Sequence, residues 1–365
     1  MRTIGIICEY NPFHYGHLHH IEEIKKKYPE ALIILVLNGY FLERGEISFL
    51  TKENKTKIAL KYGINLVIEL PFIFGTQSAD TFANEAIKRL NELKVTDIIF
   101  GSETNNVSAL RKIAQKQLEL NFNDKVKENL KNGYNYPSAL ANALELNFIY
   151  NPNDLLGISY IKSILLNKYN INVQTIKRTN DYHDLESNDK IISASNIRKK
   201  ILNNEDIRNY LPSDVSKLIN IPNYEIYFKL IKYKILTDNN LQNYLDVEEG
   251  IEYRLKKCIK KANNLSEFIG SVKTKRYTYN KINRILIHIL IGLKKDDNLK
   301  DNSYIKILGF DKKGQKYLRS IKKEINLTKD PTIYNYELTA SLIYDLICNT
   351  NTYQFELQNK PITHE

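Results

Sequence analysis

The order of apolar and polar positions divides the chain into two parts. In the first 200 residues, short apolar runs alternate with segments in which apolar positions recur every three or four residues. Buried strands separated by amphipathic helices are typical of a parallel sheet with helices on both faces. The predicted strands are residues 3–8, 32–37, 65–70, 97–100 and 172–176, and the predicted helices between them are residues 18–27, 52–61, 79–93 and 154–166.

Beyond residue 203 the strand-like runs disappear, and helical patterns take their place at residues 226–236, 240–261 and 280–293. We therefore predict an α/β fold. A doubly wound, Rossmann-like parallel-sheet domain spans residues 1–204, and a mainly α-helical domain spans residues 205–365. Ligands of doubly wound sheets bind at the carboxyl ends of the strands, so the residues that follow the strands are the first candidates for a site.

The composition indicates a cytoplasmic protein that does not interact with membranes. No apolar run approaches the roughly 18 residues that a membrane helix needs. The N-terminal residues MRTIGIICEYNPF have the pattern of a strand rather than of a signal peptide. Three widely spaced cysteines, Cys8, Cys258 and Cys348, argue against a disulfide framework and fit a reducing compartment.

The positive charge of the chain is concentrated in one late segment. The formal net charge is +11, and residues 251–330 carry 21 Lys/Arg against 8 Asp/Glu. The remainder of the chain is therefore slightly acidic. A basic block of this kind is a candidate surface for a polyanion, and a solvated lysine-rich face is the alternative.

Four of the seven histidines fall in the stretch NPFHYGHLHH, directly after the first predicted strand. A strand-to-helix turn in such a sheet presents backbone N–H groups and the positive end of a helix dipole, which favour phosphate. His14 and His17 flank Gly16 and can donate to phosphate oxygens, while glycine leaves room for a ligand near the backbone. No GxGxxG pattern is present, so a dinucleotide fingerprint does not explain this turn.

Two other interpretations of the histidines stay open at this point. A zinc site would use His14 and His17, although no second Cys/His pair stands at metal-ligand spacing elsewhere in the sequence. A purely structural cluster is the other. His19 and His20 fit supporting positions on the helix better than ligand positions.

Two motifs resemble those of a known superfamily. His14-Tyr15-Gly16-His17 is similar to the first signature of the nucleotidyltransferases related to class I tRNA synthetases, and ISASNIR at residues 192–198 is similar to their second signature. The serines of the second motif can cap a helix, and Arg198 can reach the β- and γ-phosphates of a nucleotide. The resemblance implies a HIGH-type nucleotidyltransferase domain at residues 1–204.

The resemblance extends to one family along nearly the whole chain. Segments similar to the tRNA(Met) cytidine acetate ligase family are EYNPFHYGHLHH, NGYFLERGE, LVIELPF, TQSADTFANEAI, IIFGSE, LLGISYIKSI, KRTNDYHD, KTKRYTYNKINRILIHIL and YIKILGFDKKGQ. This likeness implies a ligase that activates acetate with ATP as acetyl-adenylate. The acetyl group then passes to N4 of the wobble cytidine of elongator tRNA(Met), giving N4-acetylcytidine. Mg²⁺ is expected as a counter-ion of pyrophosphate, with its ligands unknown.

The resemblance also implies site residues. The catalytic candidates are His14, His17, Arg198 and Lys162, the last in LLGISYIKSI. The implied ATP-binding residues are Ile7, Cys8, Glu9, Tyr10, Asn11, Pro12, Phe13, His14, Tyr15, Gly16, His17, Leu18, His19, His20, Gly101, Asn153, Arg178, Ser193 and Ser195.

The basic segment SVKTKRYTYNKINR supplies the candidate tRNA-binding residues, because it interleaves cations with aromatic rings that can stack on bases. They are Lys273, Lys275, Arg276, Tyr277, Lys281 and Arg284. The chain departs from the usual family pattern at three positions. Glu43 stands at a usual glutamine, and Lys55 and Lys281 stand at usual arginines, which removes the bidentate fork but keeps the charge.

Two rival functions fit part of the sequence. A small-metabolite adenylyltransferase explains both motifs but not the basic helical region. An RNA-binding protein with a vestigial nucleotide site explains the basic region, but the intact HxGH and ISASNIR motifs argue against lost chemistry.

Overall fold

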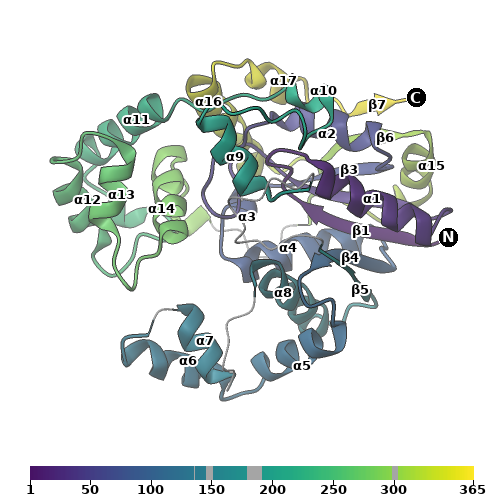
Figure 1. Cartoon of the computed structure of the whole chain (residues 1–365), viewed down its shortest axis with the longest axis horizontal. Coiled ribbons are helices and arrows are strands. Elements are labelled where there is room, and N and C mark those ends of the chain that lie inside the picture. Colours follow the sequence, from purple (N-terminus) through teal and green to yellow (C-terminus); the bar gives the residue numbers. More distant parts are fainter. Residues whose placement is uncertain (135, 145–150, 179–190, 298–302) are drawn as a thin grey trace.

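One seven-stranded sheet organises the structure, a computed structural model that describes residues 1–134, 136–144, 151–178, 191–297 and 303–365. The strand order is β5-β4-β1-β2-β3-β6-β7 (Figure 1). The strands are β1 (Thr3–Cys8), β2 (Leu32–Asn38), β3 (Leu66–Leu70), β4 (Asp97–Ser102), β5 (Asn172–Lys177), β6 (Ile307–Asp311) and β7 (Ile362–His364). The five predicted strands are therefore confirmed.

The strands β1 to β5 are parallel, and helices cover both faces of the sheet they form. Along β2 the side chains alternate: Ile34 and Val36 join the hydrophobic cluster on one face, and Ile33 and Leu35 join the cluster on the other. All seven residues of β2 are buried. This two-sided burial explains the continuous apolar runs, and it confirms the α/β class.

The helices of the first part include all four predicted ones. They are α1 (Tyr15–Lys27), α2 (Lys52–Lys61), α3 (Phe72–Gly75), α4 (Ala79–Glu92), α5 (Val107–Gln117), α6 (Phe122–Lys131), α7 (Tyr136–Ala143), α8 (Pro152–Leu166), α9 (Ala194–Leu202) and α10 (Ser213–Ser216). Side chains of Thr51, Ser78 and Ser193 cap α2, α4 and α9 by accepting backbone N–H groups of the first turn. Helices α6 and α7, which were not predicted, project away from the sheet (Figure 1).

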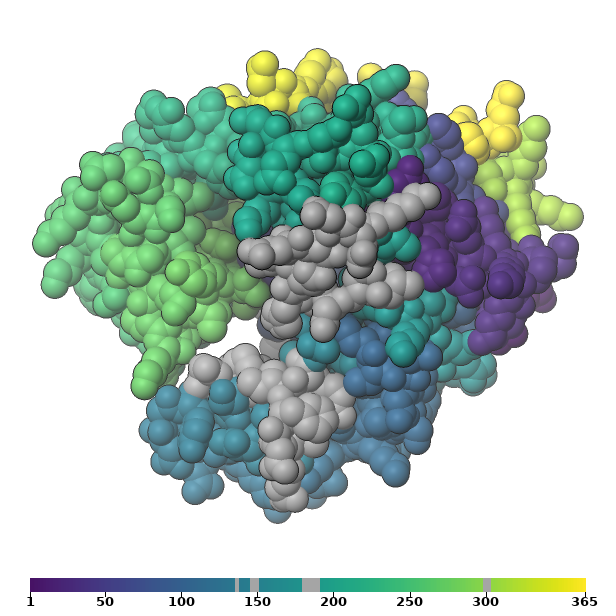
Figure 2. All heavy atoms as spheres, in the orientation of Figure 1, coloured from purple at the N-terminus to yellow at the C-terminus, as the bar shows by residue number. Residues whose placement is uncertain are grey.

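The region after residue 203 is mainly helical, as predicted. Its helices are α11 (Tyr224–Thr237), η1 (Leu241–Asn243), α12 (Ile251–Ile259), α13 (Leu265–Val272), α14 (Tyr279–Ile291), η2 (Lys295–Asp297), α15 (Lys312–Ile321), α16 (Pro331–Cys348) and α17 (Thr352–Gln358). The helix predicted at residues 240–261 was wrong, because left-handed backbone at Asp246, Glu249 and Gly250 interrupts it before α12. Helices α11 to α14 form a lobe beside the sheet (Figure 1), and Figure 2 shows this lobe in green at the left of the molecule.

The prediction that strands end before residue 204 was also wrong. Strand β6 pairs antiparallel with β3, and β7 pairs parallel with β6, so residues from the end of the chain complete the sheet. These strands are only 5 and 3 residues long, too short to stand out as apolar runs. One hydrophobic cluster also joins Ile34 in the sheet to Leu286 in the helical lobe. The domain boundary at residues 204/205 therefore remains a prediction. It fits helices α11–α14, which form a lobe outside the sheet, better than β6 and β7, which are part of the sheet.

Across the described residues, no helix has both the length and the apolar character needed to span a bilayer.

Candidate functional site

A pocket of about 260 Å³ opens where β1, β4 and β5 end. Sixteen residues expected from the sequence line it. They come from the end of β1, the loop that follows and helix α1, from the ends of β4 and β5, and from the first turns of α8 and α9 with the residues before them. They are Ile7, Cys8, Glu9, Tyr10, Asn11, His14, Gly16, His17, His19, His20, Gly101, Asn153, Arg178, Ser193, Ser195 and Arg198. The carboxyl edge of the sheet thus brings together segments that lie far apart in the sequence, as the doubly wound topology requires.

Four of the expected nucleotide contacts do not line this pocket. Pro12, Phe13, Tyr15 and Leu18 are absent from its wall. Phe13 is fully buried and packs edge-on against Tyr10, with 4.9 Å between the ring centroids. Phe13 therefore supports the loop after β1 by packing against Tyr10, and it does not face the pocket.

The two histidines of the HxGH motif are fixed by backbone hydrogen bonds. His14 is the N-cap of α1, and its Nδ1 accepts the Gly16 N–H at 3.0 Å. The His17 Nδ1 accepts the His14 N–H at 3.2 Å. In a neutral ring whose Nδ1 accepts, the proton resides on Nε2. Each ring therefore has an N–H donor at Nε2, the nitrogen that its backbone contact leaves available.

Burial keeps these imidazoles neutral. Burial, with a smaller contribution from the nearby Arg178 and Arg198, lowers the pKa of His14 to about 3. Burial also lowers the pKa of His17 well below its usual value and that of His20 to about 4. The rings can stabilise negative charge as hydrogen-bond donors without acting as acids at neutral pH.

Gly16 has a structural role in addition to the one expected from the sequence, because the His14 ring lies close to its Cα. A Cβ at this position would lie 2.7 Å from Cε1 and 2.9 Å from Nδ1 of His14. The glycine thus makes room for the capping imidazole, not only for a ligand.

The ISASNIR motif begins helix α9 on the opposite wall. Ser193 caps this helix by accepting the Asn196 N–H at 3.2 Å. One turn later, Arg198 donates from Nη1 to the Asn11 carbonyl at 2.8 Å and from Nη2 to Glu46 Oε2 at 2.7 Å. The guanidinium is therefore tied to the loop after β1 and to a pocket carboxylate.

The third wall joins the ends of β4, β5 and α8. Asn153 donates to Glu103 Oε1 at 2.5 Å, and Arg178 Nε lies 3.8 Å from the same oxygen. A Cβ at Gly101 would lie 3.3 Å from Arg178 Cγ, so the small residue accommodates this arginine. Residues 179–184 of the KRTNDYHD segment lie outside the described residues.

Lys162 does not line the pocket, which corrects its expected catalytic position. Asn153, Leu156 and Tyr160 of α8 do line it, but Lys162 follows Tyr160 by two residues, about 200° around the helix. The Lys162 Nζ donates to Asp80 Oδ2 at 2.5 Å beside a separate cavity of about 270 Å³.

The basic segment is only partly exposed. Lys273, Lys275 and Arg276 are exposed, and Arg276 pairs with Glu249 at 2.5 Å. Lys281 is half-buried, with its Nζ 5.3 Å from the centroid of the Tyr277 ring.

Two members of the expected tRNA-binding set lie inside the protein. Tyr277 is 8% exposed and donates its hydroxyl to the Glu248 carbonyl at 3.1 Å, so it is not available to stack on a base. The Arg284 side chain is 14% exposed and lies 3.6 Å from carboxylate oxygens of both Glu43 and Asp246. Arg284 lies in the apolar stretch NRILIHIL, a pattern typical of a helix that packs against the core.

Lys55 had no predicted role, although its position departs from the usual family pattern. Its buried Nζ donates to the carbonyls of Glu9 at 3.1 Å, Asn38 at 2.8 Å and Gly39 at 2.6 Å. Burial lowers the pKa of Lys55 to about 7. Lys55 joins the segments that follow β1 and β2, and only the folded topology shows why a cation is needed there.

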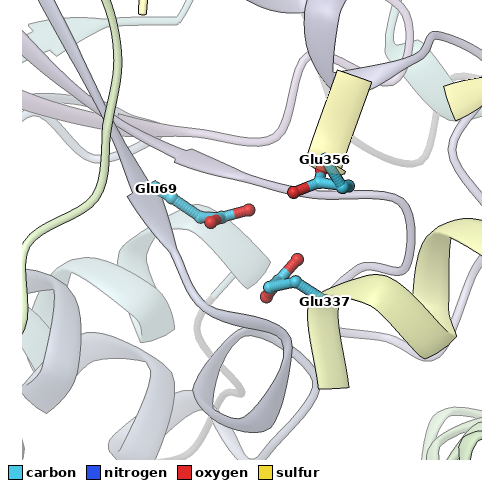
Figure 3. Close-up of side chains that lie close together, drawn as sticks. All are labelled: Glu69, Glu337 and Glu356. Carbon is cyan, nitrogen blue, oxygen red and sulfur yellow. The ribbon is translucent and has the colours of Figure 1, made fainter. Parts of the chain in front are cut away.

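Three buried carboxylates suggest a metal site elsewhere in the fold. Figure 3 shows Glu69, Glu337 and Glu356 turned toward one another, and each offers a ligand oxygen within 4.8 Å of the others. The Lys52 Nζ contacts all three of these side chains, at 2.7 Å from Glu337 and Glu356. The Lys306 Nζ lies 3.1 Å from Glu69 and 2.5 Å from Glu356. Two ammonium groups therefore occupy the place of a cation, and the cluster binds the C-terminal helices to the sheet.

A zinc site at the HxGH loop is not supported either. Within the described ranges, the three glutamates above are the group whose geometry suits a metal, and neither His14 nor His17 belongs to it. Their Nδ1 atoms already accept backbone hydrogen bonds.

The fold and this pocket define a nucleotidyltransferase of the HIGH type. A family model described as HIGH Nucleotidyl Transferase matches residues 1–360. A solved structure described as Thermotoga maritima TmcAL bound with alpha-thio ATP aligns with a TM-score of 0.86 and 26% identity, covering 100% of this chain and 99% of that chain.

Curated relatives narrow the assignment. A tRNA(Met) cytidine acetate ligase of Geobacillus sp. (strain WCH70) is 38% identical, covering 99% of this chain and 100% of the relative. One of Bacillus subtilis (strain 168) is 36% identical, covering 95% and 92%. The chain belongs to the family of HIGH nucleotidyltransferases whose curated members are named tRNA(Met) cytidine acetate ligases.

Proposed function

We propose that the protein is an ATP-dependent acetate ligase that forms acetyl-adenylate and acetylates N4 of the wobble cytidine of elongator tRNA(Met). The likeness to curated ligases over 99% of the chain carries this proposal. The chemistry of the pocket supports it, because neutral histidine donors and an arginine converge beside the carboxyl edge of the sheet.

In the first step, an acetate oxygen attacks the α-phosphorus of ATP, and pyrophosphate leaves with the bonding electrons. A carboxylate is already a nucleophile, so the step depends on positioning and on charge stabilisation. The Nε2–H groups of His14 and His17 would donate to phosphate oxygens, and Arg198 would neutralise charge on the leaving pyrophosphate. Mg²⁺ would serve as a counter-ion of the pyrophosphate, and the carboxylates of Glu9 and Glu46, near the HxGH and ISASNIR motifs, would be the groups placed to hold it.

In the second step, the N4 amine of cytidine attacks the acetyl carbonyl. The tetrahedral intermediate collapses, AMP leaves, and the amine loses a proton. The anticodon loop is single-stranded, so its wobble base can turn outward into a pocket. Lys273, Lys275 and Arg276 give a cationic surface for the RNA backbone, and the 53% exposed Tyr279 replaces Tyr277 as a candidate stacking ring. A cytoplasmic location remains a prediction.

Acetate-dependent exchange of labelled pyrophosphate into ATP tests the activation step without RNA. We expect exchange with acetate and none without a carboxylate. Exchange that needs a different small metabolite would favour the adenylyltransferase alternative. The absence of exchange with any carboxylate, together with retained tRNA binding, would favour an RNA-binding protein with a vestigial site.

A further inference from the structure

A short hairpin connects the pocket with the helical lobe. Residues 40–48 follow β2, and we call them the pocket hairpin. The Leu42 N–H donates to the Glu46 carbonyl at 3.0 Å, and the Ser48 N–H donates to the Tyr40 carbonyl at 2.8 Å. These paired hydrogen bonds make the segment a defined unit that can transmit a displacement from its tip to its arms.

The tip of the pocket hairpin lies directly against the backbone of α14. Gly45 adopts a left-handed conformation with φ +70, and a Cβ there would lie 2.4 Å from Arg284 N and 2.4 Å from Asn283 C. These atoms belong to a regular helix and cannot move aside singly. The close approach therefore requires glycine, and it fixes the tip against α14.

Charge reinforces this contact on one side of the tip. Arg284 Nη1 lies 3.6 Å from Glu43 Oε1, and Arg284 Nε lies 3.6 Å from Asp246 Oδ2. The side chains of Arg284 and Glu43 are only 14% and 19% exposed. In such surroundings the attraction is screened less than on the surface.

The same hairpin holds the arginine of the ISASNIR motif on its other side. Glu46 Oε2 accepts from Arg198 Nη2 at 2.7 Å. The Glu43 N–H also donates to Glu9 Oε1 at 2.8 Å, which ties the tip to the residue after β1. Both carboxylates of the pocket hairpin therefore face arginines, one in the lobe and one in the pocket.

We propose that Arg284 is a positioning residue for Arg198, acting through the pocket hairpin. Arg284 and α14 hold the tip, the tip sets the place of Glu46, and Glu46 sets the guanidinium that faces the leaving pyrophosphate. The inference rests on the proposed function for the role of Arg198. It replaces the expectation that Arg284 contacts tRNA phosphate, for which its side chain is too deeply buried.

The test compares R284A and E43A with K257A, which removes an exposed positive charge from α12 of the same lobe. Acetate-dependent pyrophosphate exchange is measured without tRNA. We expect R284A and E43A, each of which removes the contact between Arg284 and Glu43, to lower kcat about two- to thirtyfold, the range found for residues that couple sites through contacts, with a smaller change in KM for ATP. R284K should restore part of the loss, and K257A should match wild type.

Hydrogen exchange supplies a readout that does not depend on activity. The backbone amides of Leu42 and Ser48 should exchange faster in R284A and E43A, while K257A leaves them unchanged. E43A leaves α14 unchanged, so it tests the inference if R284A does not fold. Wild-type kcat and unchanged amides in folded R284A or E43A would overturn the inference. A wild-type protein without acetate-dependent exchange would instead contradict the proposed function, and the amides would still test the positioning.

Discussion

His14 and His17 orient each other: the His14 backbone N–H donates to His17 Nδ1 at 3.2 Å, and the two ring centroids are 4.0 Å apart. The His14 Nδ1 in turn accepts the Gly16 N–H at 3.0 Å. The HxGH spacing is thus a reciprocal cap in which two backbone contacts select the same tautomer in both rings. This arrangement prepares two neutral donors before any nucleotide binds.

Replacing His17 with alanine should nearly abolish acetate-dependent pyrophosphate exchange. Removing one preorganised donor to developing charge lowers rates on the order of 10² to 10³. Affinity for tRNA should stay near wild type, because the exposed cations lie in the helical lobe. His364→Ala, at an exposed position in β7, is the matched control. Exchange at the wild-type rate in H17A would remove this histidine from the mechanism.

Acid should destabilise the protein partly through His20. Its pKa lies at about 4 in the folded state, because burial opposes its charge, against a usual value of 6.5. The unfolded chain therefore binds more protons below pH 6.5, and stability is lost as the pH falls from there toward 4. The contribution between pH 7 and pH 5 is roughly 2 kcal/mol.

Denaturant unfolding of wild type and His20→Gln at pH 7 and pH 5 measures this contribution. The variant should lose less stability than wild type on acidification. The comparison between variants is needed because Glu43 and Glu337, whose pKa values burial raises to about 7, change stability in the opposite direction. Equal losses in both proteins would show that His20 is not held neutral.

Replacing Lys52 with methionine should destabilise the fold by about 3–5 kcal/mol, because it leaves the buried Glu337 carboxylate without its ammonium partner. Glu69, Glu337 and Glu356 all contact this ammonium group. Lys57→Ala on the exposed side of α2, where it pairs with Glu53, should change stability by less than about 0.5 kcal/mol. Urea unfolding compares the two, and a K52M variant as stable as K57A would mean that the cluster adjusts by taking up protons.

The exposed cations should determine how tRNA binding responds to salt. Each phosphate contact contributes about −0.7 to −0.9 to the slope of log K against log salt. Replacing Lys273, Lys275 and Arg276 together with alanine should flatten this slope by roughly 2 to 3 units and leave tRNA-free exchange intact. Arg284 is left out because its side chain is only 14% exposed and is paired with Glu43 and Asp246. An unchanged slope in the folded triple variant would place the tRNA on another surface.

The sequence predicts the strands β1 to β4 well because each is a mostly buried apolar run. The edge strand β5 is only half-buried, and its pattern in the sequence is correspondingly weaker. Strands β6 and β7 were missed because their pairing partners lie far away in the chain. Strand β6 pairs with β3, some 240 residues earlier, and no local pattern indicates that pairing. The break in the helix near Gly250 was missed because the helical pattern of the sequence continues through residues whose backbone is left-handed.

The site residues that stand in sequence motifs could be predicted, whereas the positions of residues that depend on tertiary contacts could not. His14, His17 and Arg198 stand in recognisable motifs. Lys162 was expected in the pocket, but its side chain donates to Asp80 instead. This contact could not be predicted without knowing which helix packs beside α8. Tyr277 was expected on a surface because its sequence neighbours are basic, whereas it is 8% exposed and its hydroxyl donates to the Glu248 carbonyl.

Mass spectrometry of nucleosides from elongator tRNA(Met), after incubation with the protein, ATP and isotope-labelled acetate, tests the proposed function most directly. Labelled N4-acetylcytidine should appear at the wobble position, should require ATP, and should be absent with H17A. Unmodified cytidine in the presence of wild-type protein, ATP and acetate, with tRNA binding demonstrated in the same sample, would contradict the account.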